Sequence, residues 1–120
     1  MVKFSFENLN VYEKAIDFVD MVYTITKSFP KDEKYNLTSQ FSRAATSIAL
    51  NIAEGAGDSN AQFNRFLQIA QNNIRECIVC ATIAKRQCYI TDEVDISIRR
   101  KLSEMAKMIT NLQKYLKNKN

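Results

Sequence analysis

Apolar side chains in this sequence recur at alternating spacings of three and four residues over most of the chain. Such a stripe lines one face of an α-helix, because about 3.6 residues make one turn. The stripes run from Val11 to Phe29, from Leu37 to Ala53, from Phe63 to Cys88 and from Ile98 to Leu116. The second is less regular and rich in alanine, which would let a neighbouring helix approach closely. The pattern predicts four helices with heptad seams, as in antiparallel bundles.

Turn-forming residues are scarce and lie between the stripes. The 120 residues include two glycines and one proline, too few for the corners of a β-sandwich or barrel. These breaks predict helices over about residues 9–28, 36–55, 59–88 and 92–117. Because the connections are short, neighbouring helices should be antiparallel. We therefore predict a single all-α domain over residues 1–120, an antiparallel up-down-up-down four-helix bundle.

Polar residues at the expected helix starts predict side-chain caps, and glycines mark one helix end. The candidate caps are Asn8 or Asn10, Asn36 or Thr38, Asp58 or Ser59, and Thr91. Gly55 and Gly57 are expected to end the second helix by adopting left-handed backbone angles.

Two of the expected helices carry more apolar surface than one buried seam needs. The first has a second apolar line beside its seam, and residues 77–84 are apolar almost all round. Exposing both would leave a patch too large for a monomer, so we predict self-association; the alternative is a loose or aggregation-prone monomer. The expected oligomer interface consists of Tyr12, Ile16, Val19, Tyr23, Ile78, Val79, Cys80 and Ile83.

The formal net charge of +4 is unevenly distributed along the chain. Residues 1–60 carry six basic and eight acidic side chains, whereas residues 61–120 carry eleven and five. Such asymmetry suggests a polyanionic or acidic partner; the alternative is solubility together with cations that favour a helix C-terminus. The candidate nucleic-acid-binding residues are Arg99, Arg100, Lys101, Lys107, Lys114 and Lys117.

Heptad numbering aligns three of these cations on the outer face of the last helix. Arg100, Lys107 and Lys114 are seven residues apart, a ridge suited to a phosphate backbone. Glu104 is expected to lie within reach of the first two and to dilute their field. Tyr115 is the only aromatic residue nearby, so base stacking is not indicated and binding should be weakly sequence-selective.

The residue types leave little room for catalysis. There is no histidine, which removes the usual general base and the Ser-His and Cys-His pairs. Cys77 and Cys80 form half a zinc site without a second half, and they are better explained as small core residues. Glu13, Asp17 and Asp20 are typical of a solvated face. We predict no catalytic residue, metal, cofactor or small-molecule substrate.

The sequence also indicates the cellular compartment of the protein. The N-terminus lacks the apolar core of a signal peptide, and the longest uncharged stretch, Ala44–Ala53, is ten residues long, too short to span a membrane. An odd number of cysteines fits a reducing environment. We expect a cytoplasmic protein without a membrane partner.

The motif LTSQFSRAATSIALNIAEG, from Leu37 to Gly55, resembles the 23S rRNA intervening-sequence proteins, a family also called the four-helix bundle proteins. The opening Phe6–Ala15 stretch is similar as well, with Tyr12 where the family usually has tryptophan. Ser28–Lys31, Phe63–Ala70 and Tyr89–Ile90 also match. The resemblance thus covers nearly the whole chain.

The resemblance implies an up-down four-helix bundle that assembles as a homopentamer, with no established biochemical activity. The family is also similar to the accessory protein of diversity-generating retroelements, a basic pentamer that engages a reverse transcriptase and nucleic acid. The family-motif residues Arg43, Asn51 and Glu54 are interpreted as a partly buried polar cluster that fixes helix register or a subunit contact. The alternative is that Asn51 and Glu54 only tie down the Gly55 turn.

Together these observations give the hypothesis of a non-enzymatic oligomer that binds RNA or a ribonucleoprotein through a basic surface. The alternative is a protein-interaction scaffold whose oligomer presents apolar helix faces to another protein.

Overall fold

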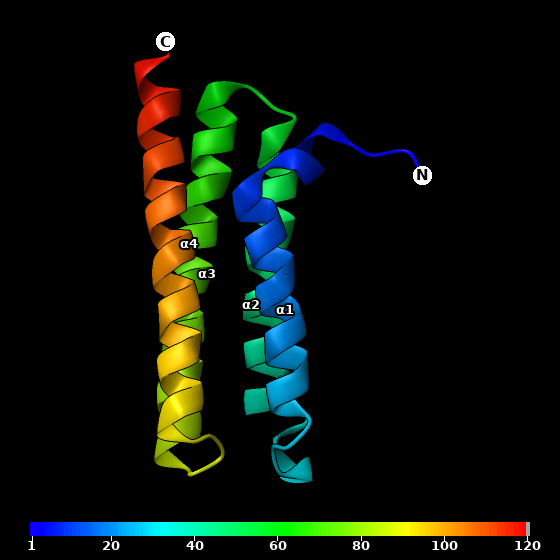
Figure 1. The fold of residues 1–120 in the computed structure, drawn as a ribbon, viewed down its shortest axis with the longest axis vertical. Helices are drawn as coiled ribbons and strands as arrows, with labels where there is room; N and C mark the ends of the chain where they lie inside the picture. Colours follow the sequence, from blue (N-terminus) through cyan, green and yellow to red (C-terminus); the bar gives the residue numbers. More distant parts are fainter. Residues whose placement is uncertain (120) are drawn as a thin grey trace.

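The computed structural model describes residues 1–119, and four long α-helices form the fold (Figure 1). The elements in chain order are the 3-10 helix η1 (Ser5–Asn8), α1 (Asn10–Thr26), the 3-10 helix η2 (Lys31–Glu33), α2 (Leu37–Ala56), α3 (Asn60–Arg86) and α4 (Asp92–Asn118). No strand occurs within the described residues. The prediction of an all-α chain with four helices is confirmed.

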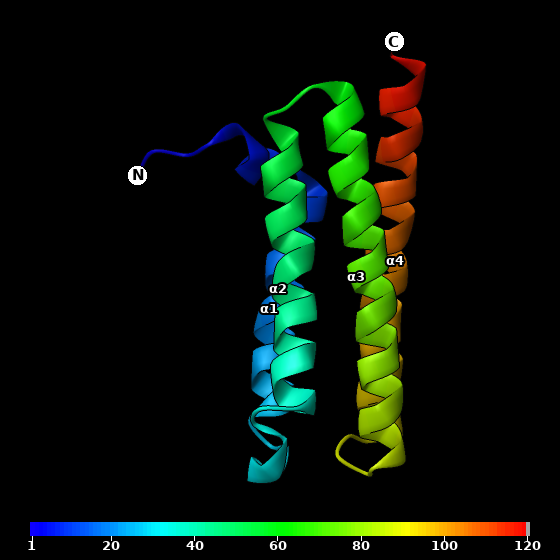
Figure 2. The same cartoon turned by 180° about the vertical axis from the view of Figure 1, so that it is seen from behind.

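The helices lie side by side along the longest of the 47 × 31 × 22 Å dimensions. In Figures 1 and 2 the chain reverses direction between successive helices, and α1 and α4 lie on the opposite side of the bundle from α2 and α3. The contact between α2 and α3 is the most extensive, and that between α1 and α4 is the least extensive. The bundle is therefore tightest at α2–α3 and loosest at the seam between its first and last helices.

The core consists largely of the heptad seams expected from the sequence. Phe18, Phe41, Leu67 and Leu102, one from each helix, have no exposed surface. Fully burying side chains of this size stabilises the folded state by roughly 1.5–3 kcal/mol each. Cys88, the last residue of the expected third seam, is exposed instead.

Two helices begin with the side-chain caps that the sequence suggests. The Gln62 amide donates to the Ser59 hydroxyl at 3.3 Å, and the Val94 amide donates to the Thr91 hydroxyl at 3.2 Å. Each bond satisfies one of the backbone N–H groups that a helix start leaves unpaired. Of the two candidate caps for α3, Ser59 and not Asp58 therefore occupies the N-cap position.

The other two helices begin without the expected side-chain cap, although Asn36 does stand at the N-cap position of α2. Residue Leu9 precedes α1 and has no capping side chain, and the Asn36 side chain does not cap α2. The Leu37 amide instead donates to Glu33 Oε1 at 3.3 Å. Glu33 Oε2 accepts a hydrogen bond from the Tyr89 hydroxyl at 2.8 Å, so one carboxylate joins the α1–α2 connection to the α3–α4 connection.

Two helices stop before the expected residue. Helix α1 ends at Thr26 rather than near residue 28, because the Ser28 and Phe29 amides donate to carbonyls three residues back and tighten the chain ahead of Pro30. Helix α3 ends at Arg86, because Cys88 adopts a left-handed conformation with φ of 62°. A left-handed residue terminates a helix.

Gly55 has a different role from the one expected. Neither glycine has a positive φ, so left-handed backbone does not explain them. A Cβ atom on Gly55 would lie 2.7 Å from Phe66 Cβ and 2.9 Å from Phe63 Cδ1. The residue is buried within α2, and its missing side chain lets the backbone of α2 pack directly against α3.

The cysteines divide into two environments. Cys77 has no exposed surface and Cys80 is 5% exposed, and both belong to the core. Burial raises the pKa of both thiols above its usual range. Because the thiolate is the reactive form, these two residues are inert core side chains, whereas Cys88 is exposed.

We predict that Gly55→Ala lowers the free energy of unfolding by about 1–2 kcal/mol, because overpacking against Phe63 and Phe66 exceeds the gain in helix propensity. Gly57→Ala is the matched control, since nothing lies within 4 Å of its Cβ position, and it should be neutral or stabilising by up to about 1 kcal/mol. Urea denaturation followed by circular dichroism measures both. Equal stabilities would contradict the close α2–α3 contact.

A second prediction concerns thiol reactivity. One thiol should react rapidly with a disulfide reagent in the native protein, and all three only after denaturation, because Cys77 and Cys80 are buried and hard to ionise. Cys88→Ser should abolish the rapid phase. Rapid native labelling that persists in Cys88→Ser would show that the buried assignment is wrong.

Candidate functional site

The outer face of α4 presents a row of cations. Arg100, Lys107 and Lys114 are exposed, and their seven-residue spacing places neighbours about 10.5 Å apart along the helix. None of the three forms an ion pair with any residue from 1 to 119. Arg100 and Lys107 line an open hollow of about 660 Å³ on this face. We call these three residues the basic ridge.

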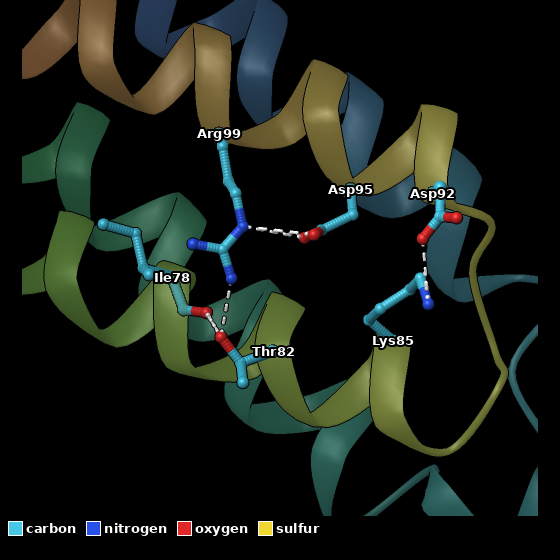
Figure 3. Close-up of polar contacts among 6 residues, drawn as sticks. All are labelled: Ile78, Thr82, Lys85, Asp92, Asp95 and Arg99. Carbon is cyan, nitrogen blue, oxygen red and sulfur yellow. Dashed lines mark hydrogen bonds and ion pairs between the residues drawn. The ribbon is translucent and has the colours of Figure 1, made fainter.

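Arg99 is held differently from the residues of the ridge (Figure 3). Its Nε donates to Asp95 Oδ1 at 3.1 Å and to Oδ2 at 3.2 Å, and its Nη2 donates to the Thr82 hydroxyl at 2.7 Å. The Thr82 hydroxyl in turn donates to the Ile78 carbonyl at 2.9 Å. Arg99 therefore joins α4 to α3, and Asp95 compensates its charge.

A second ion pair joins the same two helices near their connection. Lys85 Nζ lies 2.9 Å from Asp92 Oδ1. The ion pair and its hydrogen bond raise the pKa of Lys85 above its usual range. Both side chains are solvent-exposed to a large extent, so the pair contributes little to stability.

The remaining candidate cations, Lys101 and Lys117, are exposed but lie off the ridge. Lys101 projects about 100° from Arg100 around the helix axis, and Lys117, three residues after Lys114, projects about 60° from that residue. The six candidate residues are thus not one continuous surface: three form the ridge, two flank it and Arg99 is paired.

Glu104 lines the same hollow as Arg100 and Lys107, as the sequence suggests, but its ion pair is with another helix. Its Oε1 lies 3.1 Å from Lys14 Nζ on α1. Both side chains of this pair are about half exposed, so the pair offsets the negative charge of Glu104 only in part.

The three family-motif residues occupy α2 without joining one another. Asn51 Nδ2 donates to the Ser47 carbonyl at 2.8 Å within the helix. Arg43 and Glu54 are exposed, and among residues 1–119 no hydrogen bond or ion pair links either one to Asn51. The polar cluster is therefore absent from the single chain, and Asn51 is bonded away from the Gly55 turn. A subunit contact through these residues stays a prediction.

The apolar residues expected at an interface are only partly available. Val79 is 56% exposed, and Ile16, Tyr23 and Ile83 are exposed as well. Tyr12, Val19 and Ile78 are half-buried against the core. Cys80 is 5% exposed and lines a hollow between α3 and α2, so it leaves little surface for a subunit contact.

The sequence pattern also missed exposed apolar residues, among them one on α2 and one on α3. Leu50 on α2 is 61% exposed and Ile69 on α3 is 38% exposed. Leu50 lies two residues from both Ile48 and Ile52 of the second seam, which places it on the opposite side of the helix. This two-residue offset from the seam is the sequence signal that would have identified Leu50 as exposed.

No further chemical site emerges from the part of the chain described. Among residues 1–119 no group of three or more histidine, cysteine, aspartate or glutamate side chains is arranged to hold a metal ion. Over the same residues, every helix is too short or too polar to cross a membrane.

Comparison with known proteins places this arrangement in a family. The profile of the 23S rRNA-intervening sequence protein family matches residues 7–111. A crystal structure of a protein of the S23 ribosomal protein family from Bacteroides thetaiotaomicron, whose function is unknown, is 28% identical with a TM-score of 0.80, and the match covers 87% of this chain and 98% of that one. No curated protein matches. Since the matched region runs from η1 through most of α4, the chain belongs to the 23S rRNA-intervening sequence protein family.

Proposed function

We propose that the chain is a non-enzymatic, oligomeric, antiparallel up-down-up-down four-helix bundle that binds RNA or a ribonucleoprotein through the basic ridge of α4. The observation that carries the proposal is that Arg100, Lys107 and Lys114 are exposed on one face and free of ion pairs within the described residues. A line of uncompensated cations attracts the backbone of a polyanion and releases its counterions.

The chemistry of the ridge determines how such binding would behave. Three phosphate contacts on a single strand correspond to a slope of about −2 in a plot of log affinity against log salt. Tyr115 is exposed, but the Lys119 ammonium lies 5.4 Å from the centre of its ring, which covers part of the aromatic surface. Stacking on bases is therefore limited, and the binding should be weakly sequence-selective.

An oligomer would strengthen this weak interaction. We propose a homo-oligomer, with the pentamer that the family resemblance implies as its form. The support is the exposed apolar surface of Tyr23, Leu50, Val79 and Ile83. Repeating the ridge on each subunit raises the effective concentration for the second and later contacts.

The same apolar residues favour one alternative function. A scaffold whose oligomer offers Leu50, Val79 and Ile83 to a different protein would also cover them. This alternative predicts that a protein partner remains bound after nuclease treatment, whereas the RNA proposal predicts loss of the associated material.

The RNA proposal predicts that reversing the ridge with Arg100→Glu, Lys107→Glu and Lys114→Glu abolishes binding to a fluorescent single-stranded RNA at low salt, as measured by anisotropy. The matched control is Lys27→Glu, Lys31→Glu and Lys34→Glu, which makes the same charge change around the α1–α2 connection and should retain most of the affinity. Absence of RNA binding by the unmodified protein, or equal loss in both variants, would contradict the proposal.

The oligomer proposal predicts that Val79→Asp combined with Ile83→Asp yields monomers in native mass spectrometry at micromolar concentration. Charged side chains would have to lose their hydration at the interface. Ile96→Asp is the control, because Ile96 is 54% exposed on α4 outside the expected interface. A monomeric unmodified protein, or an unchanged mass in the double variant, would refute this interface.

A further inference from the structure

The loosest seam of the bundle, between α1 and α4, contains an acidic-rimmed apolar groove. An open hollow of about 460 Å³ lies there, and its lining includes Met21 and Ile25 from α1 and Val94 from α4. All three are partly buried side chains packed against the core. The groove is thus a place where the helices leave core-facing apolar surface open to a ligand.

The rim of the groove has one sign of charge. Asp17, Asp20 and Glu93 line it, and no basic residue does. Within residues 1–119 none of these three carboxylates forms an ion pair. The nearby ammonium of Lys14 is bonded to Glu104. An uncompensated acidic rim on a chain of net charge +4 repels polyanions and attracts cations.

The dimensions of the groove suit a helix. Asp17 and Ile25 at its two ends are eight residues apart on α1, a rise of about 12 Å. An amphipathic helix that presents apolar residues at positions i, i+3, i+4 and i+7 places them over about 10.5 Å. Lysine or arginine side chains beside that apolar stripe would then reach the carboxylates on both walls.

We propose that the α1–α4 groove is a docking site for a basic amphipathic helix of a partner protein. Its apolar stripe covers Met21, Ile25 and Val94, and its flanking cations pair with Asp17, Asp20 and Glu93. Charge complementarity selects this occupant over a nucleic acid, which the same carboxylates repel. The site shares no residue with the basic ridge, although Glu93 lies seven residues before Arg100 on α4, and the proposal does not depend on RNA binding.

The test uses a fluorescent 16-residue helical peptide with leucines at positions i, i+3, i+4 and i+7 and lysine or arginine elsewhere. Anisotropy should show saturable binding that weakens as salt rises. Asp17→Asn, Asp20→Asn and Glu93→Gln together should reduce the affinity at least tenfold. The matched control neutralises three exposed carboxylates outside the groove, Asp32→Asn, Glu54→Gln and Glu76→Gln, and should change it less than twofold.

Two further peptides separate docking from charge attraction alone. A peptide of the same composition with its leucines dispersed around the helix should bind at least tenfold more weakly, and one with glutamate flanks should not bind. Equal binding of the dispersed peptide, or equal loss in both triple variants, would overturn the proposal.

Photocrosslinking maps where the peptide contacts the unmodified protein, so this test does not depend on the variants. A photoreactive group on the leucine face should crosslink to residues 17–25 and 93–97 of the unmodified protein. Crosslinks confined to other helices would overturn the proposal. A groove that a second copy of the chain already covers would also overturn the proposal. In that case the peptide would not bind, and the assembly mass of the Asp17→Asn, Asp20→Asn, Glu93→Gln variant would differ from that of the unmodified protein.

Discussion

At Gly55 the backbone of α2 lies against the side chains of Phe63 and Phe66, with no room for a methyl group between them. Both helices also bury small side chains, among them Ala44 on α2 and Ala70 and Ala81 on α3. Since packed interiors tolerate neither voids nor excess atoms, this contact fixes how α2 and α3 lie against each other. Helices α1 and α4 then pack on the outside of that pair and meet only loosely.

That asymmetry separates the surfaces of the molecule. The loose α1–α4 seam leaves a groove with an acidic rim, and the outer face of α4 carries the basic ridge. The Lys14–Glu104 ion pair crosses the seam between the two helices, and Glu104 still lines the hollow beside Arg100 and Lys107. The exposed apolar residues Leu50 and Val79 lie on α2 and α3, away from both charged sites. One bundle thereby offers three chemically distinct faces.

Helical spacing was enough to predict the four helices and most of their core, because burial of one apolar stripe dominates the energetics of each helix. It was not enough for contacts between helices. The pairing of Arg99 with Asp95 and Thr82, the capping of α2 by Glu33 and the close approach at Gly55 depend on how helices are rotated against one another, which periodicity leaves open. The end of α3 was missed because the left-handed residue is Cys88, a residue type that seldom adopts that conformation.

Native-state hydrogen exchange measures most directly whether the α2–α3 contact is the stable centre of the bundle. Amides protected by a tightly packed pair exchange only through global unfolding, whereas loosely packed segments open locally. Tight packing of α2 against α3 predicts the slowest exchange in the facing turns of these helices, around Ile48, Ile52, Leu67 and Ile74, and faster exchange at residues 93–97 beside the groove. Protection that is highest in α1 and α4, or uniform across the four helices, would contradict it.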